Sequence, residues 1–264
     1  MTSEPASRDT RSRTIVLIPA RLAATRLPGK PLAAIAGEPM IVHVWRRAVE
    51  ADLGRVVVAA ADPPIAEAVA RAGGEAVVVA DELPSGTDRI FRALLRLDPE
   101  RRFARIVNLQ GDLPTIDPAD LARVVEPLER LGCDLSTLAV ESADPEDRAR
   151  FQVVKVIPSF LPEDPTLARA LYFTRAPAPW GEGPIWHHIG VYAFTRAALE
   201  RFCALAPSPL ERREKLEQLR ALEAGMTIGV KLVASAPFGV DTPEDLERAR
   251  RVLEARLAVR FADP

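Results

Sequence analysis

Short apolar runs alternate with helical patterns along the first half of the chain, and this alternation limits the fold most strongly. Residues 14–19 (TIVLIP) form a continuous apolar run, as expected of a strand that is buried on both faces. Further strands are predicted at 55–60, 75–79 and 105–109, and helices at 40–51, 64–72, 88–97 and 118–131. This β-α-β-α order predicts an α/β fold with an open, mostly parallel sheet flanked by helices.

The middle of the chain breaks the alternation. Four strands are predicted there without full helices between them, at 135–140, 152–157, 170–174 and 189–194. A smaller, partly antiparallel insertion explains this pattern, and a helix, a strand and a helix then follow at 212–224, 228–233 and 243–257. No long linker is evident, so we expect a single domain over 14–264 behind a disordered polar tail at 1–13.

The composition excludes several classes of protein. The chain has 264 residues, with 35 Lys and Arg against 37 Asp and Glu, and this balance argues against a general nucleic-acid or membrane-surface binder. Its two cysteines are too few for a disulfide framework and are not spaced like metal ligands. We therefore expect the protein to lie in a reducing compartment. No apolar run reaches the ~18 residues that a membrane span needs. We therefore expect a globular, cytoplasmic protein.

The segment after the first strand, PARLAATRLPGKP, carries Arg21, Arg26 and Lys30 within ten positions. Ligands of open parallel sheets bind beyond the carboxyl ends of the strands, where this loop lies. The loop matches neither the dinucleotide fingerprint nor the P-loop, because Gly29 is its only glycine. Three cations on a tight loop suit a polyphosphate, and a solvated loop with ordinary surface cations is the alternative.

Two aspartates follow predicted strands and are candidate Mg²⁺ ligands. Asp112 ends the segment NLQGD, where Gly111 allows a close backbone approach; a turn aspartate is the alternative reading. Asp241 lies in GVDTPEDLE, where Thr242 is a natural N-cap and Pro243 suits the first helical position. Those two residues have a structural role, whereas Asp241 has none that the sequence shows.

Eight motifs together carry a family resemblance. They are RLPGKP (26–31), SGTDR (85–89), NLQGD (108–112), ALYFTRA (170–176), HIGVY (188–192), PSPLE (207–211), LEQLR (216–220) and GVDTPEDLE (239–247). With them the chain resembles the 3-deoxy-manno-octulosonate cytidylyltransferases, or CMP-KDO synthetases, which are sugar-acid nucleotidyltransferases. The resemblance implies a Rossmann-like nucleotide-binding sheet of the nucleotide-diphospho-sugar transferase type.

The activity that the resemblance implies is Mg²⁺-dependent transfer of CMP from CTP to 3-deoxy-D-manno-octulosonate (KDO). Pyrophosphate is the second product, and CMP-KDO is the activated sugar for lipopolysaccharide synthesis. The resemblance also implies a homodimer, with 135–210 as the sugar-binding and dimerisation subregion. No nucleic-acid or membrane partner is expected.

The resemblance assigns a role to each matched residue. Catalytic roles fall to Arg21, Lys30, Asp112 and Asp241, of which the two acids are the expected Mg²⁺ ligands. The expected CTP-binding residues are Arg21, Arg26, Lys30, Ser85, Gly86 and Gln110. The expected sugar-acid pocket is formed by Arg175, His188, Tyr192, Glu217 and Gln218, with Glu211 as a weaker candidate.

Several of these residues have simpler explanations. Arg175 could be a surface arginine after a strand, and Tyr192 a half-buried strand aromatic. His187 and His188 are neighbours on a predicted strand and so point to opposite faces, which argues against a shared zinc ion. Glu217 and Gln218 are neighbours on the predicted helix 212–224. Successive side chains of a helix point about 100° apart, so one of the two could be structural.

Two alternative functions remain open. One is a cytidylyltransferase for amino-KDO or another sugar acid, and the other is a non-catalytic nucleotide-binding module. Such a module should lack one of the two acids or the loop lysine, and all three are present. The chain departs from the common family pattern at Leu113, at Phe151-Gln152 and at His187.

Overall fold

A computed structural model describes residues 11–23, 26–142 and 144–260, with side chains described as far as Arg256. The chain divides into two compact units. Unit 1 comprises the described parts of Met1–Phe103, Asn108–Leu121 and Pro237–Pro264, and unit 2 comprises Ala104–Val107 and Ala122–Ala236. Of the predicted tail at 1–13, residues 1–10 lie outside the described residues, whereas Arg11 forms an ion pair with Asp52 (2.5 Å). The predicted subregion 135–210 lies within unit 2.

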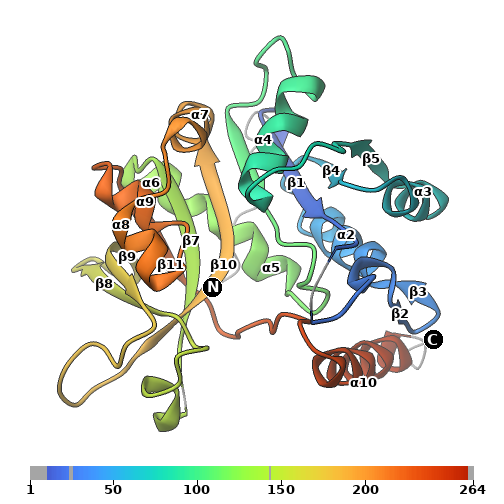
Figure 1. Cartoon of the computed structure of the whole chain (residues 1–264). Coiled ribbons are helices and arrows are strands. Elements are labelled where there is room, and N and C mark those ends of the chain that lie inside the picture. Colours follow the sequence, from blue (N-terminus) through green and yellow to red (C-terminus); the bar gives the residue numbers. More distant parts are fainter. Residues whose placement is uncertain (1–10, 24–25, 143, 261–264) are drawn as a thin grey trace. The chain divides into compact units, whose positions relative to one another are not determined.

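Unit 1 contains a parallel sheet with the strand order β5–β4–β1. Strand β1 (Thr14–Ala20) pairs with β4 (Arg55–Ala60), which pairs with β5 (Glu75–Val78). Every residue of β1 is buried, which explains why its sequence is apolar from Ile15 onward. Helices α2 (Met40–Glu50), α3 (Pro63–Arg71) and α4 (Gly86–Leu97) pack on these strands (Figure 1). The remaining elements are η1 (Lys30–Leu32), β2 (Ala34–Ile35), β3 (Glu38–Pro39), α5 (Pro118–Ala122) and α10 (Pro243–Arg260).

Unit 2 contains strands in the order β6–β10–β7–β11–β9–β8. Their bounds are β6 (Arg105–Asn108), β7 (Leu135–Glu141), β8 (Lys155–Leu161), β9 (Asp164–Thr174), β10 (Trp186–Thr195) and β11 (Ile228–Leu232). Strand β11 runs parallel to β7, whereas β7–β10, β9–β11 and β8–β9 are antiparallel pairs. The predicted α/β class, with helices around a mostly parallel sheet and a partly antiparallel part, is confirmed.

The helices of unit 2 are shorter than the sequence predicts. They are η2 (Arg123–Val125), α6 (Glu126–Leu131), η3 (Pro145–Arg148), α7 (Arg196–Ala204), α8 (Pro209–Glu214) and α9 (Leu219–Glu223). The predicted helix 118–131 is wrong as one element, because Pro127 stands in the first turn of a new helix, α6. The predicted helix 212–224 is also wrong, because Lys215 adopts a left-handed conformation (φ 54°) that ends α8. The sequence did not predict α7.

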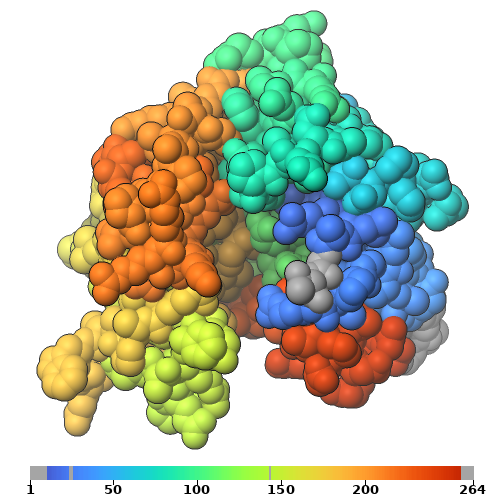
Figure 2. All heavy atoms as spheres, in the orientation of Figure 1, coloured from blue at the N-terminus to red at the C-terminus, as the bar shows by residue number. Residues whose placement is uncertain are grey.

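An apolar cluster joins the loop after β1 to α10 within unit 1. Leu27 from the loop packs against buried residues that include Val240, Leu246 and Leu253. In the space-filling view the N-terminal segments in blue lie against α10 in red (Figure 2). The loop that carries the three cations is therefore fixed by hydrophobic packing to the C-terminal helix. Among the described residues, no helix combines the length and apolar character needed to cross a membrane.

Candidate active site

The loop after β1 is shaped by a glycine in a left-handed conformation. Gly29 has φ 70°, which costs little without a Cβ, and its N–H donates to the Leu22 carbonyl (3.2 Å). The next N–H, that of Lys30, donates to the Leu27 carbonyl (3.2 Å). The start of the loop is held by Asp62, whose Oδ2 accepts from the Leu22 N–H (2.8 Å). The chain thus folds back and places Lys30 at the start of η1.

The QGD segment approaches the end of β1 closely. A Cβ on Gly111 would lie 2.7 Å from the Pro19 carbonyl oxygen, so only glycine fits without a backbone shift. The carbonyl of Asp112 accepts from the Val240 N–H (2.9 Å). This contact brings Asp241 next to Asp112, although the two residues are far apart in the sequence.

The predicted cap of α10 is confirmed. The Asp245 N–H donates to Thr242 Oγ1 (3.2 Å), and Pro243 is the first residue of the helix. In return, Asp245 Oδ2 accepts from the backbone N–H groups of Asp241 (3.1 Å) and Thr242 (3.0 Å). The cap therefore fixes the backbone of Asp241 and leaves its carboxylate for other contacts.

Lys30 joins the two predicted Mg²⁺ ligands. Its Nζ lies 2.9 Å from Asp112 Oδ2 and 3.1 Å from Asp241 Oδ1, and Arg26 Nη2 lies 3.0 Å from Asp241 Oδ2. Burial alone would lower the pKa of Lys30, but the two carboxylates outweigh it and raise that pKa above its usual value. The ammonium therefore stays charged between the two acids.

All the residues predicted to bind CTP or to catalyse line one cavity of about 400 Å³ in unit 1. They are Arg21, Arg26, Lys30, Ser85, Gly86, Gln110, Asp112 and Asp241. The size is that of an ordinary small-molecule site. The predicted grouping of the phosphate loop with the two acids is thus found in the structure.

Ser85 and Gly86 have clear structural roles at this cavity. Ser85 is the N-cap of α4: its Oγ accepts from the Asp88 N–H (3.1 Å) and donates to Asp88 Oδ2 (2.8 Å). A Cβ on Gly86 would lie 3.1 Å from Pro19 Cγ, so a larger residue would crowd the end of β1. The hydroxyl of Ser85 is thus used by the helix cap, and its contact with a nucleotide stays a prediction.

Arg89 also lines the cavity, and sequence reasoning did not single it out, although it ends the SGTDR motif. It is only 5% exposed, and its guanidinium donates to the carbonyls of Val79 and Asp81. Burial and the nearby charge of Arg21 lower the pKa of Arg89. Arg89 therefore holds the backbone that follows β5 and adds positive charge to the cavity wall.

The two carboxylates fit Mg²⁺. Within the described part of the chain, no three His, Cys, Asp or Glu side chains form a metal-binding group, so a protein cage is excluded there. Mg²⁺, however, is commonly held by one or two carboxylates together with substrate phosphates and water. Asp112 and Asp241 already converge on one cation, the Lys30 ammonium. They are therefore suited to hold a metal ion beside a bound triphosphate.

His188 and Tyr192 lie together in unit 2, as predicted. Their ring centroids are 5.5 Å apart, and a bulge in β10 between Ile189 and Tyr192 does not separate them. Thr137 Oγ1 donates to the Val191 carbonyl (2.7 Å) and lies 3.0 Å from His188 Nε2, so this nitrogen is the donor to the hydroxyl. Burial lowers the pKa of His188 to about 3, and the imidazole is neutral.

Glu217 and Gln218 lie in the turn between α8 and α9, which corrects their predicted place on a helix. Burial, and then the charge of Glu217, raise the pKa of Tyr192 well above its usual value. Gln218 is 5% exposed, and its Nε2 has no hydrogen-bond partner among the described residues. Such a buried donor is costly to leave unpaired, and a polar ligand would satisfy it.

The predicted carboxylate binder Arg175 is tied to the backbone. Its Nε donates to the Glu214 carbonyl (2.8 Å), Nη1 to the Phe151 carbonyl (3.1 Å) and Nη2 to the Lys215 carbonyl (3.5 Å). These contacts use three of its five N–H groups. Arg175 therefore joins two segments of unit 2, and its contact with a sugar acid stays a prediction.

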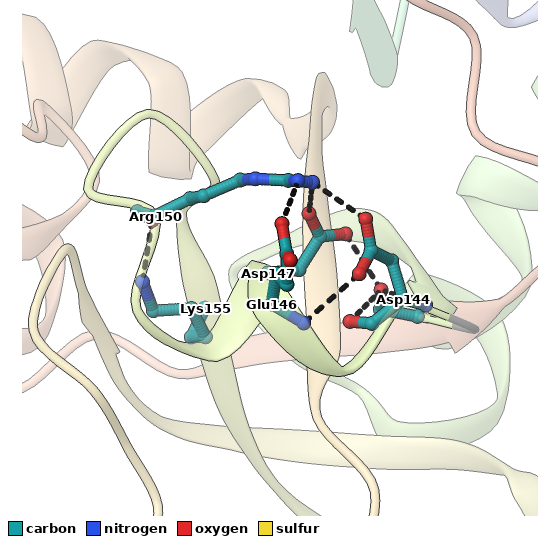
Figure 3. A network of polar contacts seen from close by, with 6 residues as sticks. Asp144, Glu146, Asp147, Arg150 and Lys155 are labelled. Carbon is teal, nitrogen blue, oxygen red and sulfur yellow. Dashed lines mark hydrogen bonds and ion pairs between the residues drawn. The ribbon is translucent and has the colours of Figure 1, made fainter.

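The buried side chain of Lys155 binds the backbone of Arg175. It is fully buried, and its Nζ donates to the carbonyls of Arg150 (3.0 Å) and Arg175 (2.8 Å). Figure 3 shows Lys155 beside Arg150, whose guanidinium binds Asp144 (2.6 Å) and Asp147 (2.8 Å). This network anchors the segment that leads into β8.

Glu211, the weaker candidate for binding the sugar acid, stabilises the fold. It forms a capping box with Ser208 at the start of α8. Its carboxylate also binds Arg220 through Nε (2.9 Å) and Nη2 (2.5 Å). These contacts occupy Glu211 within the α8–α9 pair.

Comparisons with known proteins identify the family. A family model described as cytidylyltransferase matches residues 15–228. The 3-deoxy-manno-octulosonate cytidylyltransferase of Parvibaculum lavamentivorans is 59% identical over 254 residues, which are 96% of this chain and 98% of that protein. The protein of the same name from Mesorhizobium japonicum is 60% identical over 240 residues, 91% of this chain and 98% of that protein.

A solved structure shares both the fold and much of the sequence. It is CMP:2-keto-3-deoxy-manno-octonic acid synthetase complexed with CTP, with a TM-score of 0.85 and 35% identity over 93% of this chain and 100% of that one. The motifs, the cavity in unit 1 and these relatives agree. The chain belongs to the cytidylyltransferase family and, within it, to the 3-deoxy-manno-octulosonate cytidylyltransferases.

Proposed function

We propose that this chain transfers CMP from CTP to KDO, releasing pyrophosphate, with Mg²⁺ held by Asp112 and Asp241. The observation that carries the proposal is the Lys30 ammonium between these two carboxylates, in a cavity that also carries Arg21 and Arg26. The names of the relatives support KDO as the acceptor, and the relative complexed with CTP supports the nucleotide.

At the α-phosphorus the reaction forms one bond and breaks one. The anomeric hydroxyl oxygen of KDO bonds to the α-phosphorus of CTP, and the hydroxyl proton passes to water. The bond from this phosphorus to the β-phosphate oxygen breaks, and pyrophosphate leaves with the electron pair. Arg21, Arg26 and Lys30 bind the triphosphate and balance the charge that develops on pyrophosphate.

Such a transfer depends mainly on positioning and charge neutralisation. When bound, Mg²⁺ would neutralise charge on the phosphate oxygens and help orient them. Asp112 and Asp241 supply the carboxylate oxygens for it. Lys30 keeps its proton because of these carboxylates and is available to bind a phosphate oxygen.

The proposed KDO-binding residues lie in unit 2. His188 is neutral, Tyr192 lies beside it, and the buried Nε2 of Gln218 can donate to a sugar hydroxyl. Arg175 has two N–H groups left for the carboxylate of the acid. An amino-KDO differs from KDO at one substituent and is the nearest alternative acceptor.

The proposal extends to the oligomeric state, the location and the biosynthetic role of the protein. We propose a homodimer, since unit 2 exposes the large apolar side chains Phe151 (64%), Leu171 (62%) and Trp180 (100%). We propose a cytoplasmic location, where CTP is available, and a role in supplying activated KDO for lipopolysaccharide. Sedimentation equilibrium would test the dimer.

The experiment that tests the activity measures pyrophosphate release with CTP and, in turn, KDO, amino-KDO and sialate. We expect release with KDO in the presence of Mg²⁺ and none after EDTA, with recovery when Mg²⁺ is added back. Faster release with amino-KDO than with KDO would replace the proposed acceptor. Tight CTP binding without release on any acceptor would favour the non-catalytic module.

A further inference from the structure

Arg175 and Glu214 of unit 2 bind each other by hydrogen bonds in both directions. The side chain of Arg175 donates from Nε to the Glu214 carbonyl (2.8 Å) and from Nη2 to the Lys215 carbonyl (3.5 Å). In return, the Glu214 carboxylate accepts from the backbone N–H of Arg175 (2.9 Å) and from Thr174 Oγ1 (2.7 Å). We call Arg175 and Glu214 the reciprocal pair.

Each member of the pair completes the end of a secondary-structure element. Helix α8 ends at Glu214, because Lys215 is left-handed, and the last carbonyls of a helix have no partner within it. The Arg175 guanidinium donates to two of these carbonyls. Strand β9 ends at Thr174, and Glu214 accepts from the next backbone N–H. The pair therefore joins the end of β9 to the end of α8.

The donor and the acceptor of each bond are fixed by chemistry. Carbonyl oxygens and an ionised carboxylate only accept, whereas a guanidinium and a backbone N–H only donate. The Thr174 hydroxyl can do both, but its partner is the Glu214 carboxylate, so its hydrogen points to Glu214. Thr174 Oγ1 accepts in turn from the Ala176 N–H (3.0 Å). The pair has no second arrangement in which donors and acceptors exchange roles.

The carbonyl of Arg175 is held as well. It accepts from Nζ of Lys155 (2.8 Å), a side chain that is 0% exposed. Glu214 and Lys155 thus bind the two backbone groups of Arg175, one the N–H and the other the carbonyl. With its backbone fixed and three N–H groups of its side chain bound to carbonyls, Arg175 keeps two N–H groups in a defined place for a ligand.

The turn that follows the pair carries a buried donor without a partner. Gln218 lies four residues after Glu214, is 5% exposed, and its Nε2 makes no hydrogen bond with the described residues. A ligand oxygen at this point would remove the cost of the unpaired donor. The Gln218 carbonyl accepts from the Ala221 N–H (3.2 Å), and the start of the turn is bound by Arg175. The place of Gln218 therefore depends on how α8 ends.

We propose that Glu214 is a positioning residue of the KDO site in unit 2, which holds the Arg175 guanidinium and the turn with Gln218 in a fixed relation. KDO offers a carboxylate for the guanidinium and hydroxyl oxygens for the amide. The proposal rests on the proposed function, because it takes KDO as the ligand of unit 2. Glu214 acts through Arg175 and lies outside the motifs that carry the family resemblance.

The first test compares the kinetics of Glu214→Ala and Glu214→Gln. Alanine removes both side-chain acceptors, so we expect the KM for KDO to rise at least about tenfold, with little change in kcat or in the KM for CTP. Glutamine keeps an acceptor for the Arg175 N–H and should restore most of the loss. An unchanged KM for KDO in folded Glu214→Ala would overturn the proposal.

Asp164→Ala is the matched control, at the other end of β9. The Asp164 carboxylate also accepts from a threonine hydroxyl and a backbone N–H, both of Thr166 (2.6 and 2.9 Å). Its ion-pair partners are Arg130 and Lys231, not Arg175. We expect this change to lower the melting temperature and to leave the KM for KDO at the wild-type value. An equal rise of that KM in the control would show general destabilisation and overturn the proposal.

Hydrogen exchange measured by mass spectrometry examines the reciprocal pair without any substrate. Glu214→Ala should speed exchange in peptides that cover 174–176 and 214–221, because both ends of the pair lose hydrogen bonds. Asp164→Ala should speed exchange around 161–167 and leave those peptides unchanged. Wild-type exchange at 174–176 and 214–221 in Glu214→Ala would overturn the proposal.

Calorimetric binding of KDO in the presence of CTP separates this proposal from the proposed function. Wild-type protein that binds KDO, with binding at least about tenfold weaker in Glu214→Ala, supports the positioning role even if no pyrophosphate is released. Absence of release by such a protein would contradict the proposed function alone. Pyrophosphate release with the same KM for KDO in Glu214→Ala and wild type would overturn the positioning role alone.

Discussion

Lys30 Nζ and Asp112 Oδ2 lie 2.9 Å apart, although 82 positions separate the two residues in the sequence. The contact joins the phosphate loop to the QGD segment, and Asp241 completes it from the other side of the ammonium. One protein cation therefore stands between the two carboxylates to which we assign Mg²⁺. In the proposed reaction, the metal ion and the triphosphate would compete for these contacts.

Asp112→Asn and Asp241→Asn should each lower kcat by at least ~100-fold, because each removes charge next to the phosphorus that reacts. The isosteric amides should leave the fold intact, which circular dichroism checks. Initial rates over a range of Mg²⁺ concentrations measure the effect. Near-normal activity and Mg²⁺ dependence in Asp241→Asn would refute the role of the two acids.

Lys30→Ala should weaken the use of CTP severely, and Lys30→Arg should not fully restore it, since a planar fork does not replace a compact charge. The alanine change also removes the Lys30 ammonium from both carboxylates, and Arg26 still pairs with Asp241. We therefore expect Mg²⁺ without CTP to raise the melting temperature of Lys30→Ala more than that of the wild type. Normal kinetics for CTP in Lys30→Ala would show that the loop after β1 does not bind the triphosphate and carries ordinary surface cations.

Gly111→Ala should lower the free energy of unfolding by about 1–3 kcal/mol, the usual cost of an added methyl group in a packed site. Its Cβ would lie 2.7 Å from a backbone oxygen of β1, which cannot move aside like a side chain. Gly239→Ala is the control, because nothing lies within 4 Å of that Cβ position. Urea denaturation of both variants measures the difference, and equal stabilities would contradict the steric explanation.

The cavity in unit 1 could be predicted well from the sequence. Its residues follow strands β1, β5 and β6, and in parallel sheets the carboxyl ends of strands carry the ligand site. Asp241 could be recognised because Thr242 and Pro243 already explain the start of the following helix. Each inference depended on local signals that the structure preserves.

Unit 2 could be predicted less well, and for physical reasons. The pattern around Lys215 is periodic enough for one helix, and its left-handed conformation leaves no mark in the sequence. The contacts of Arg175 are with backbone carbonyls, which any sequence supplies.

Acid should destabilise the protein through His188. Its folded-state pKa of about 3 lies below the unfolded value of ~6.5, so the unfolded chain binds the proton first. The contribution of His188 is therefore fully present above pH ~6.5 and is lost by up to about 1.4 kcal/mol per pH unit as the pH falls toward 3.

Urea denaturation between pH 7.5 and 5 (about 2.5 units around the histidine range) measures this effect. His188→Gln can still donate to Thr137 but does not titrate, so its stability should depend less on pH than that of the wild type. His187→Gln keeps His188 and should retain most of the dependence. The same slope in wild type and His188→Gln would show that His188 is not the responsible group.

The last prediction concerns the acceptor. KDO is a carboxylate, and a charge-assisted contact with Arg175 would contribute about 1.5–3 kcal/mol, or roughly 10- to 150-fold in affinity. Arg175→Ala and His188→Ala should therefore raise the KM for KDO strongly, with little change in calorimetric CTP binding. Because Arg175 also binds backbone carbonyls, the melting temperature of the Arg175→Ala variant must be measured alongside its kinetics.

The control is His187, which points to the other face of β10. We expect His187→Ala to raise the KM for KDO much less than His188→Ala does. Equal effects of the two histidine changes, or loss of CTP binding in Arg175→Ala, would rule out this assignment of the KDO-binding residues.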